Sequence, residues 1–398
     1  MKNVIKLIIV FFFLSSFSLA INFILTGQEN SQYLTGFLYG NVFATETSSN
    51  TEKENNKVFD FSGVEQFMNI SSILEDDREP SPEEWNKLFN TPGYQVLTEG
   101  EFKKEFFVEY FKLVFMPSKS DELEKALRQE EGQAFHTKFL QHYVQAKEMR
   151  KEIQQQINKL KTQAPTIIEN ASNEASKYLP PMEKEDFIPI SFVIFANDAR
   201  GYTPVVIDVL FSIELDDMLH ILLAHELHHY YRNQILAIDR QEVSKEHMDI
   251  IWVLDQIHCE GVADQIDKRK LVSSEEGPLH FFSDQWEEMV GNAPEYITTM
   301  DELFNDLANL QKDKNEVGQQ MREKLPMSGH PIGFYMTNII IEQLGKDILI
   351  EVTVNPFAFF RLYNNAAKIK ADNTPYFSEK TMKIISGLES KYIKKEEY

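Results

Sequence analysis

The sequence predicts an α+β protein that is mostly helical, with a small β-sheet placed before one central helix. Residues 120–163 are rich in Glu, Lys and Gln and repeat apolar residues at near-helical spacing. Residues 187–196 and 204–213 are instead rich in β-branched and aromatic residues, which is typical of strands. After residue 213 the helical spacing returns for most of the chain, so helical bundles are expected to form the rest.

The N-terminus has the pattern of an export signal. Lys2 and Lys6 precede an apolar run over residues 7–25, and a basic segment before an apolar run is typical of a secretory signal. The run is also long enough to cross a bilayer, so residues 1–44 are expected to be either a cleaved signal peptide or a membrane anchor. Residues 45–57 are polar and predict a solvated linker. We therefore expect a secreted protein, or one anchored on the extracellular face of a membrane.

Residues 58–180 are expected to form a helical N-terminal part. Within it, Ser81 and Pro82 have the residue types of a helix N-cap and of the first helical position. A long helix is predicted over residues 120–163, and a second, short helix over residues 166–178. The remaining residues, which begin with the two predicted strands, make up a second part.

The composition excludes some partners. The formal net charge is −22, whereas binding to phosphate groups needs clustered Lys and Arg, so neither a nucleic acid nor an anionic lipid surface is expected as a partner. Cys259 is the single cysteine, so no intramolecular disulfide can form.

The candidate chemistry begins in residues 216–232, which run without Gly or Pro and predict a helix. His225 and His229 lie four residues apart, so both imidazoles project from one face of that helix. Two imidazoles in this arrangement can hold a zinc ion at about 2.0–2.1 Å from each nitrogen. Glu226 lies at the edge of the same face, where it can hold a water molecule at the metal without binding the metal itself.

A third metal ligand is expected from the next long helix, predicted over residues 245–270. Glu260 and Asp264 are four residues apart on this helix and share a face. Two carboxylates on a buried face need cations or donors, and a metal with its histidine ligand supplies both. We expect Glu260 to bind the metal and Asp264 to accept a hydrogen bond from a ligand imidazole. The small residues Gly261 and Ala263 are expected to let this helix pack close to the first.

A His-Glu-x-x-His motif followed by Glu-x-x-x-Asp on a later helix resembles the gluzincin metallopeptidases, and the preceding strands resemble uncharacterised bacterial families of zinc-dependent peptidases. The resemblance implies a zincin-like catalytic part over residues 181–398, Zn²⁺ as cofactor, a peptide or protein substrate and a bacterial source. It also implies that residues 204–213 or the partner strand form an upper wall that pairs with extended peptide. Cys259 departs from the pattern, because thermolysin-like enzymes carry Asn at that place.

Zinc peptidases also need a donor for the charged oxygen that develops during the reaction. His330, between two helical segments, is the first candidate, and Tyr335 and Tyr230 are rivals. His228 is expected on the surface or behind the ligands, because it lies about 100° around the helix from His229. Cys259 is expected to be a small buried residue and not a ligand.

The sequence thus predicts a hydrolase that cleaves peptide bonds with a metal-activated water and with Glu226 as general base. The alternative is a catalytically inactive zinc-binding surface or interaction protein. A third interpretation is an exported helical scaffold with a coincidental motif, which would bind no stoichiometric zinc. The intact Glu226 favours the enzyme over the inactive zinc protein, because a structural zinc site has four protein ligands and no water.

Overall fold

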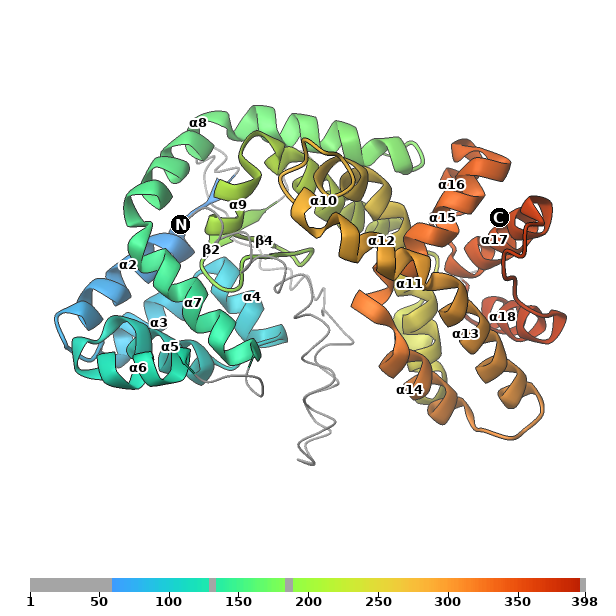
Figure 1. The fold of residues 1–398 in the computed structure, drawn as a ribbon, viewed down its shortest axis with the longest axis horizontal. Coiled ribbons are helices and arrows are strands. Elements are labelled where there is room, and N and C mark those ends of the chain that lie inside the picture. Colours follow the sequence, from blue (N-terminus) through green and yellow to red (C-terminus); the bar gives the residue numbers. More distant parts are fainter. Residues whose placement is uncertain (1–58, 129–133, 183–188, 394–398) are drawn as a thin grey trace, which may run out of the picture. The chain divides into compact units, whose positions relative to one another are not determined.

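A computed structural model describes residues 59–128, 134–182 and 189–393. The predicted signal or anchor at 1–44 and the predicted linker at 45–57 lie outside the described residues. The predicted α+β, mostly helical class is confirmed (Figure 1). Within the described residues, no helix combines the length and apolar character needed to cross a membrane.

The described residues form two compact units. The first holds residues 59–128, 134–170 and 189–220, and the second holds residues 171–182 and 221–393. The sequence placed the strands with the second part of the chain, whereas residue contacts group them with the N-terminal helices.

The first unit is built on a four-stranded sheet with the order β1-β2-β4-β3, in which β1, β2 and β4 are parallel and β3 is antiparallel to β4. Its elements are β1 (Phe59–Asp60), α2 (Ser62–Glu75), α3 (Pro82–Phe89), α4 (Pro92–Gly100), α5 (Lys104–Phe115), α6 (Ser120–Leu127), α7 (Ala134–Glu148), α8 (Arg150–Ala175, counted with this unit to residue 170), β2 (Ile190–Val193), β3 (Ala199–Arg200), β4 (Val205–Asp208) and α9 (Val209–Leu215). Gly63 and Gly93 let α2 and α4 approach β2 closely, because a side chain at either position would collide with Val193. The predicted cap is confirmed: the Ser81 hydroxyl accepts the backbone N–H of Glu84.

Three predictions for this unit are wrong. The strand predicted over residues 204–213 ends at Asp208, because the Asp208 carboxylate accepts the N–H groups of Leu210 and Phe211 and so caps the helix α9. The single helix predicted over residues 120–163 is divided among α6, α7 and α8. The predicted break near residue 164 is absent, since α8 continues through Pro165. The strand β4, within the residues 204–213 that were expected to pair with peptide unless the partner strand does so, has neighbours on both sides. The edges of the sheet are β1 and β3.

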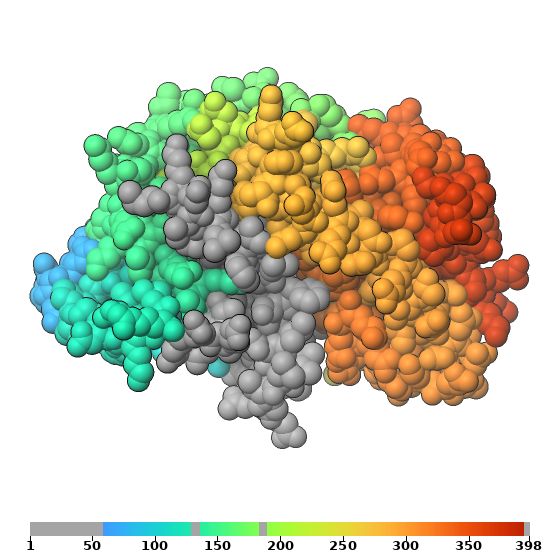
Figure 2. Space-filling model, viewed as in Figure 1, coloured from blue at the N-terminus to red at the C-terminus, as the bar shows by residue number. Residues whose placement is uncertain are grey.

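The second unit is helical. Its elements are α10 (Leu219–Ile235), α11 (Met248–Leu271), α12 (Ser283–Gly291), α13 (Ala293–Ala308), α14 (Lys314–Lys324), α15 (His330–Leu344), α16 (Lys346–Glu351), α17 (Pro356–Lys370) and α18 (Glu379–Tyr392). The helix α11 is central, and most of its residues are buried. On the face shown in Figure 2, the second unit presents mainly the orange and red residues that follow α11. The core joins Ile257, Ile297, Met336 and Phe360 from α11, α13, α15 and α17.

Candidate metal centre

The two predicted histidine ligands lie side by side on α10. The Nε2 atoms of His225 and His229 are 2.9 Å apart. His225 is buried, and the side chain of His229 is 12% exposed. Glu226 follows His225 on the same helix and is buried as well. The four-residue spacing therefore brings both ring nitrogens to one point, as the sequence predicts.

The helix α11 brings Glu260 to these nitrogens. Its Oε2 atom lies 3.4 Å from Nε2 of His225 and 3.1 Å from Nε2 of His229. Oε2 is buried and accepts no hydrogen bond from the described residues. A carboxylate oxygen in this position needs a cation or a donor, since burying a charge without one is costly.

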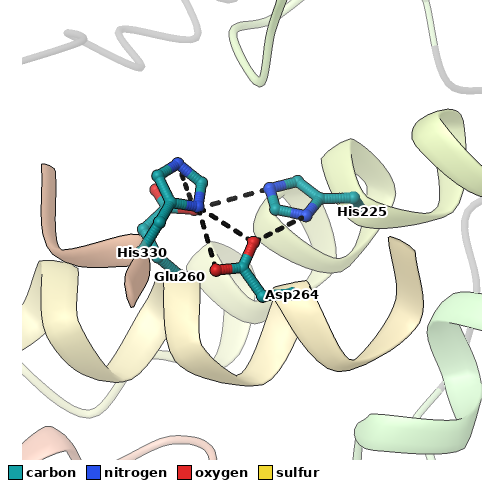
Figure 3. Close-up of side chains that lie close together, drawn as sticks. All are labelled: His225, Glu260, Asp264 and His330. Atoms are coloured by element: carbon teal, nitrogen blue, oxygen red, sulfur yellow. Dashed lines mark hydrogen bonds and ion pairs between the residues drawn. The ribbon is translucent and has the colours of Figure 1, made fainter. Parts of the chain in front are cut away.

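His330 completes the group, and two glycines explain how it arrives there. Gly329 precedes α15 with a φ of 98°, a conformation that favours glycine. Gly333, one turn further on, packs directly on α11: a Cβ atom there would lie 2.1 Å from the carbonyl oxygen of Ile257. Gly261, which we expected to face α10, instead meets the backbone of Gly333. This close crossing places His330 Nε2 3.4 Å from Oε2 of Glu260 (Figure 3).

The carboxylates behind the imidazoles differ from the prediction. Asp264 contacts Nδ1 of His330, at 2.9 Å for Oδ1 and 3.1 Å for Oδ2, while Nδ1 of His225 is 3.8 Å from Oδ1, too far for a hydrogen bond (Figure 3). Asp267 takes that place, with Oδ1 3.1 Å from Nδ1 of His225. When Nδ1 of His225 donates to Asp267, its Nε2 presents a lone pair to a metal. Sequence reasoning missed Asp267, although it lies seven residues after Glu260 and so on the same helix face.

Cys259 has a similar position behind the second imidazole. Its Sγ atom lies 2.9 Å from Nδ1 of His229. The residue is buried, as expected, and it contacts a predicted ligand without reaching the point where the Nε2 atoms meet. It therefore orients His229, in the place where the resemblance leads one to expect Asn.

Two other candidates, Tyr335 and Tyr230, contact residues outside this cluster. Tyr335 neighbours Lys370 and Thr374 at the end of α17, because five residues after His330 the helix has turned it to another side. Tyr230 packs edge-on against Tyr231. His228 is fully buried, with its ring centroid 6.2 Å from that of His229, so the structure excludes the surface position and leaves the expected position behind the ligands. Burial lowers its pKa well below the ordinary value.

The electrostatics of the cluster favour a cation. Burial lowers the pKa of His225, but Asp267 and Glu260 outweigh burial and raise it to about 10. Burial raises the pKa of Glu260, but His229 and His330 hold it well below its usual range. A metal binds imidazoles in their neutral form, and in that form the charges of Glu260, Asp264 and Asp267 exceed that of the buried Lys268 by two, before Glu226 is counted. A divalent cation would balance this excess.

The donor set and its spacing fit zinc. Ligand atoms of a tetrahedral zinc ion lie about 3.4 Å apart when each bond is about 2.1 Å. The three distances among Nε2 of His225, Nε2 of His229 and Oε2 of Glu260 are 2.9, 3.1 and 3.4 Å. Another possible set combines His225, Glu260, Asp264 and His330. We favour the first set because Asp264 already has partners in Lys268 and His330.

A buried His-His-Glu cluster with an adjacent glutamate, in a mostly helical α+β protein, is the arrangement that catalytic zinc sites use. Residues 85–372 match the family described as "Putative zinc dependent peptidase (DUF5700)", and the chain belongs to this family. The match includes every residue of the cluster. No curated protein and no solved structure gives a significant match to the chain.

Proposed function

We propose that the protein is an exported, zinc-dependent peptidase whose zinc ion is held by His225, His229 and Glu260. The observation that carries the proposal is the meeting of two Nε2 atoms and one buried carboxylate oxygen, which accepts no hydrogen bond from the described residues, on the helices that also hold Glu226. Three protein ligands leave a fourth position for water, which is the arrangement of catalytic zinc sites. The family description supports zinc-dependent peptide hydrolysis.

The chain's own residues supply the remaining chemistry. His225, His229 and Glu260 would hold the zinc ion, which would supply polarisation of the substrate carbonyl and a water nucleophile near neutral pH. Glu226 accepts the proton of the attacking water and passes it to the leaving amine. His330, held at Nδ1 by Asp264, directs Nε2 towards the same point and, when it carries a proton there, donates to the oxygen that gains charge.

Export is proposed from the N-terminal pattern of Lys2, Lys6 and the apolar run at residues 7–25. An exported peptidase would meet peptides or proteins outside the cytoplasm. Fractionation of cells that produce the full chain, followed by N-terminal sequencing, distinguishes a cleaved signal from a retained anchor. Recovery of the intact chain in the cytoplasm would contradict the proposal.

The substitution Glu226→Gln tests the function directly. It should keep zinc and lower kcat on a peptide library by about a hundred- to ten-thousandfold, because it removes the general base and no metal ligand. Zinc content by elemental analysis and peptide cleavage by mass spectrometry are the two measurements. The exposed Glu242, changed to Gln, is the matched control and should behave as the wild type.

Three outcomes are informative. Full activity in Glu226→Gln would refute the role of this residue. Stoichiometric zinc without cleavage of any peptide by the wild type would favour the inactive zinc-binding protein. A wild type without zinc would leave the motif as a coincidence.

A further inference from the structure

Lys268 lies behind the metal centre and is buried. It belongs to the last turns of α11, and only 4% of its side chain is exposed. Its Nζ atom lies 2.7 Å from Oδ2 of Asp267 and 3.2 Å from Oδ1 of Asp264. The ring of Trp286, which is also buried, has its centroid 6.0 Å from Nζ. One ammonium group thus contacts both carboxylates that stand behind the imidazoles.

Each of these carboxylates contacts a different imidazole. Asp267 contacts Nδ1 of His225, a proposed zinc ligand, and Asp264 contacts Nδ1 of His330, the proposed donor to the reacting oxygen. Lys268 is therefore the common partner of two His–Asp pairs. Nothing in the proposed reaction requires this lysine to touch zinc or substrate.

Two buried carboxylates three residues apart on one helix repel each other, and neither can reach water. The ammonium group has three N–H donors on a flexible stem, so it can bind both carboxylates at once. Without it, each carboxylate would turn towards other donors and release its imidazole. A purely structural ion pair would instead affect the stability of the fold and leave the imidazoles in place.

We propose that Lys268 is a positioning residue of this centre: by holding Asp264 and Asp267 together, it fixes His225 for metal binding and His330 for the reacting oxygen. This inference rests on the proposed function. It predicts that loss of the Lys268 side chain weakens both zinc binding and turnover, through the two carboxylates that it holds.

The test is Lys268→Met in the full chain, which keeps most of the length of the side chain and removes its charge. The dissociation constant for zinc is measured by competition with a chromogenic chelator, and kcat and KM are measured at saturating zinc. We expect zinc to bind about ten- to a hundredfold more weakly, as is typical when a partner of a ligand is lost, and kcat to fall while KM changes little. Lys270→Met is the matched control: that lysine pairs with Glu174 at the surface and should leave both values unchanged.

The variants Asp267→Asn and Asp264→Asn separate the effect on zinc binding through His225 from the effect on turnover through His330. Asp267→Asn should weaken zinc binding, whereas Asp264→Asn should lower kcat with little change in zinc binding. The double variant Lys268→Met/Asp267→Asn also serves where Lys268→Met alone folds poorly, because it removes both members of one ion pair. Its zinc affinity should equal that of Asp267→Asn, since residues that act as a unit are not additive.

Wild-type zinc affinity and kcat in Lys268→Met, or additive effects in the double variant, would overturn the role of Lys268 and leave the proposed function standing. A wild type that binds zinc and cleaves no peptide would refute the peptidase, while weakened zinc binding in Lys268→Met would still support positioning. A wild type without zinc would overturn both.

Discussion

The helices α10 and α11 contribute to two polar clusters, and the two clusters differ in the groups that face the carboxylate at their centre. The histidine cluster consists of His225, His229, Glu260 and His330. The arginine cluster consists of Arg232, Arg240, Asp255 and His258. Both lie in the second unit, and in both an acidic residue of α11 meets a basic or imidazole group of α10. The remaining members come from α15 for the histidine cluster, and from α11 and the segment after α10 for the arginine cluster.

The arginine cluster supplies its own cations. Arg232 is fully buried, and its guanidinium donates to Oδ1 of Asp255 at 2.6 Å and to the carbonyl of Thr353 at 3.1 Å. Arg240 donates to the other carboxylate oxygen of Asp255 at 2.8 Å. Each oxygen of this carboxylate therefore has a charged partner from the chain.

The histidine cluster has imidazoles in place of guanidinium groups at its centre. Oε2 of Glu260 faces ring nitrogens of three histidines and accepts no hydrogen bond from the described residues. The helix α11 thus holds one acidic residue paired with two guanidinium groups and another that faces three imidazoles, where the proposed function places zinc. The residues opposite each carboxylate make the difference, because burial is similar in both.

The largest expected effect comes from Glu260→Gln. The amide cannot serve as an anionic ligand, so bound zinc should fall from about one ion per chain to background and peptide cleavage should disappear with it. Elemental analysis and mass spectrometry of the peptide products measure the two effects. Stoichiometric zinc in Glu260→Gln would show that zinc binding does not need the Glu260 carboxylate, and the two clusters would then not differ as proposed.

The corresponding change in the arginine cluster, Asp255→Asn, should have the opposite profile. It leaves Arg232 buried without its carboxylate, which costs about 3–5 kcal/mol of unfolding free energy. Zinc should still bind at the wild-type stoichiometry in the folded protein. Urea unfolding of the chelator-treated protein measures the loss. A variant that loses zinc and keeps its stability would show that the two clusters have been assigned the wrong way round.

The sequence predicts the parts of the centre that depend on one helix at a time. The spacing of His225 and His229 on α10, and the position of Glu260 on α11, follow from helix geometry alone, and the structure brings them together. Asp267 follows the same helix geometry, but the sequence pattern alone does not distinguish it from Asp264, the first carboxylate on that face.

Contacts that depend on a third helix or strand could not be predicted from the spacing of residues within one helix. Asp264 pairs with His330 because Gly333 lets α15 approach α11, and no spacing within α11 indicates this crossing. Similarly, the β-branched pattern of residues 204–213 predicts one long strand, but the Asp208 carboxylate caps a helix in the middle of it. Local patterns describe single elements well and fail where a side chain from elsewhere decides the outcome.

The smallest expected effect is the acid sensitivity of the arginine cluster. Burial raises the pKa of Asp255, but Arg232 and Arg240 outweigh it and lower the pKa to about 2, from 3.8. A carboxyl with a depressed pKa in the folded state contributes stability above its unfolded pKa, and this contribution is lost as the pH falls towards the folded pKa. The difference in unfolding free energy between the wild type and Asp255→Asn should therefore narrow by about 2 kcal/mol between about pH 5 and pH 2. Unfolding of both proteins without metal across this range measures it, since the other titrating groups are shared. A constant difference would mean that the Asp255 carboxylate is ordinary in acid strength, and that its two guanidinium partners hold it less firmly than their distances indicate.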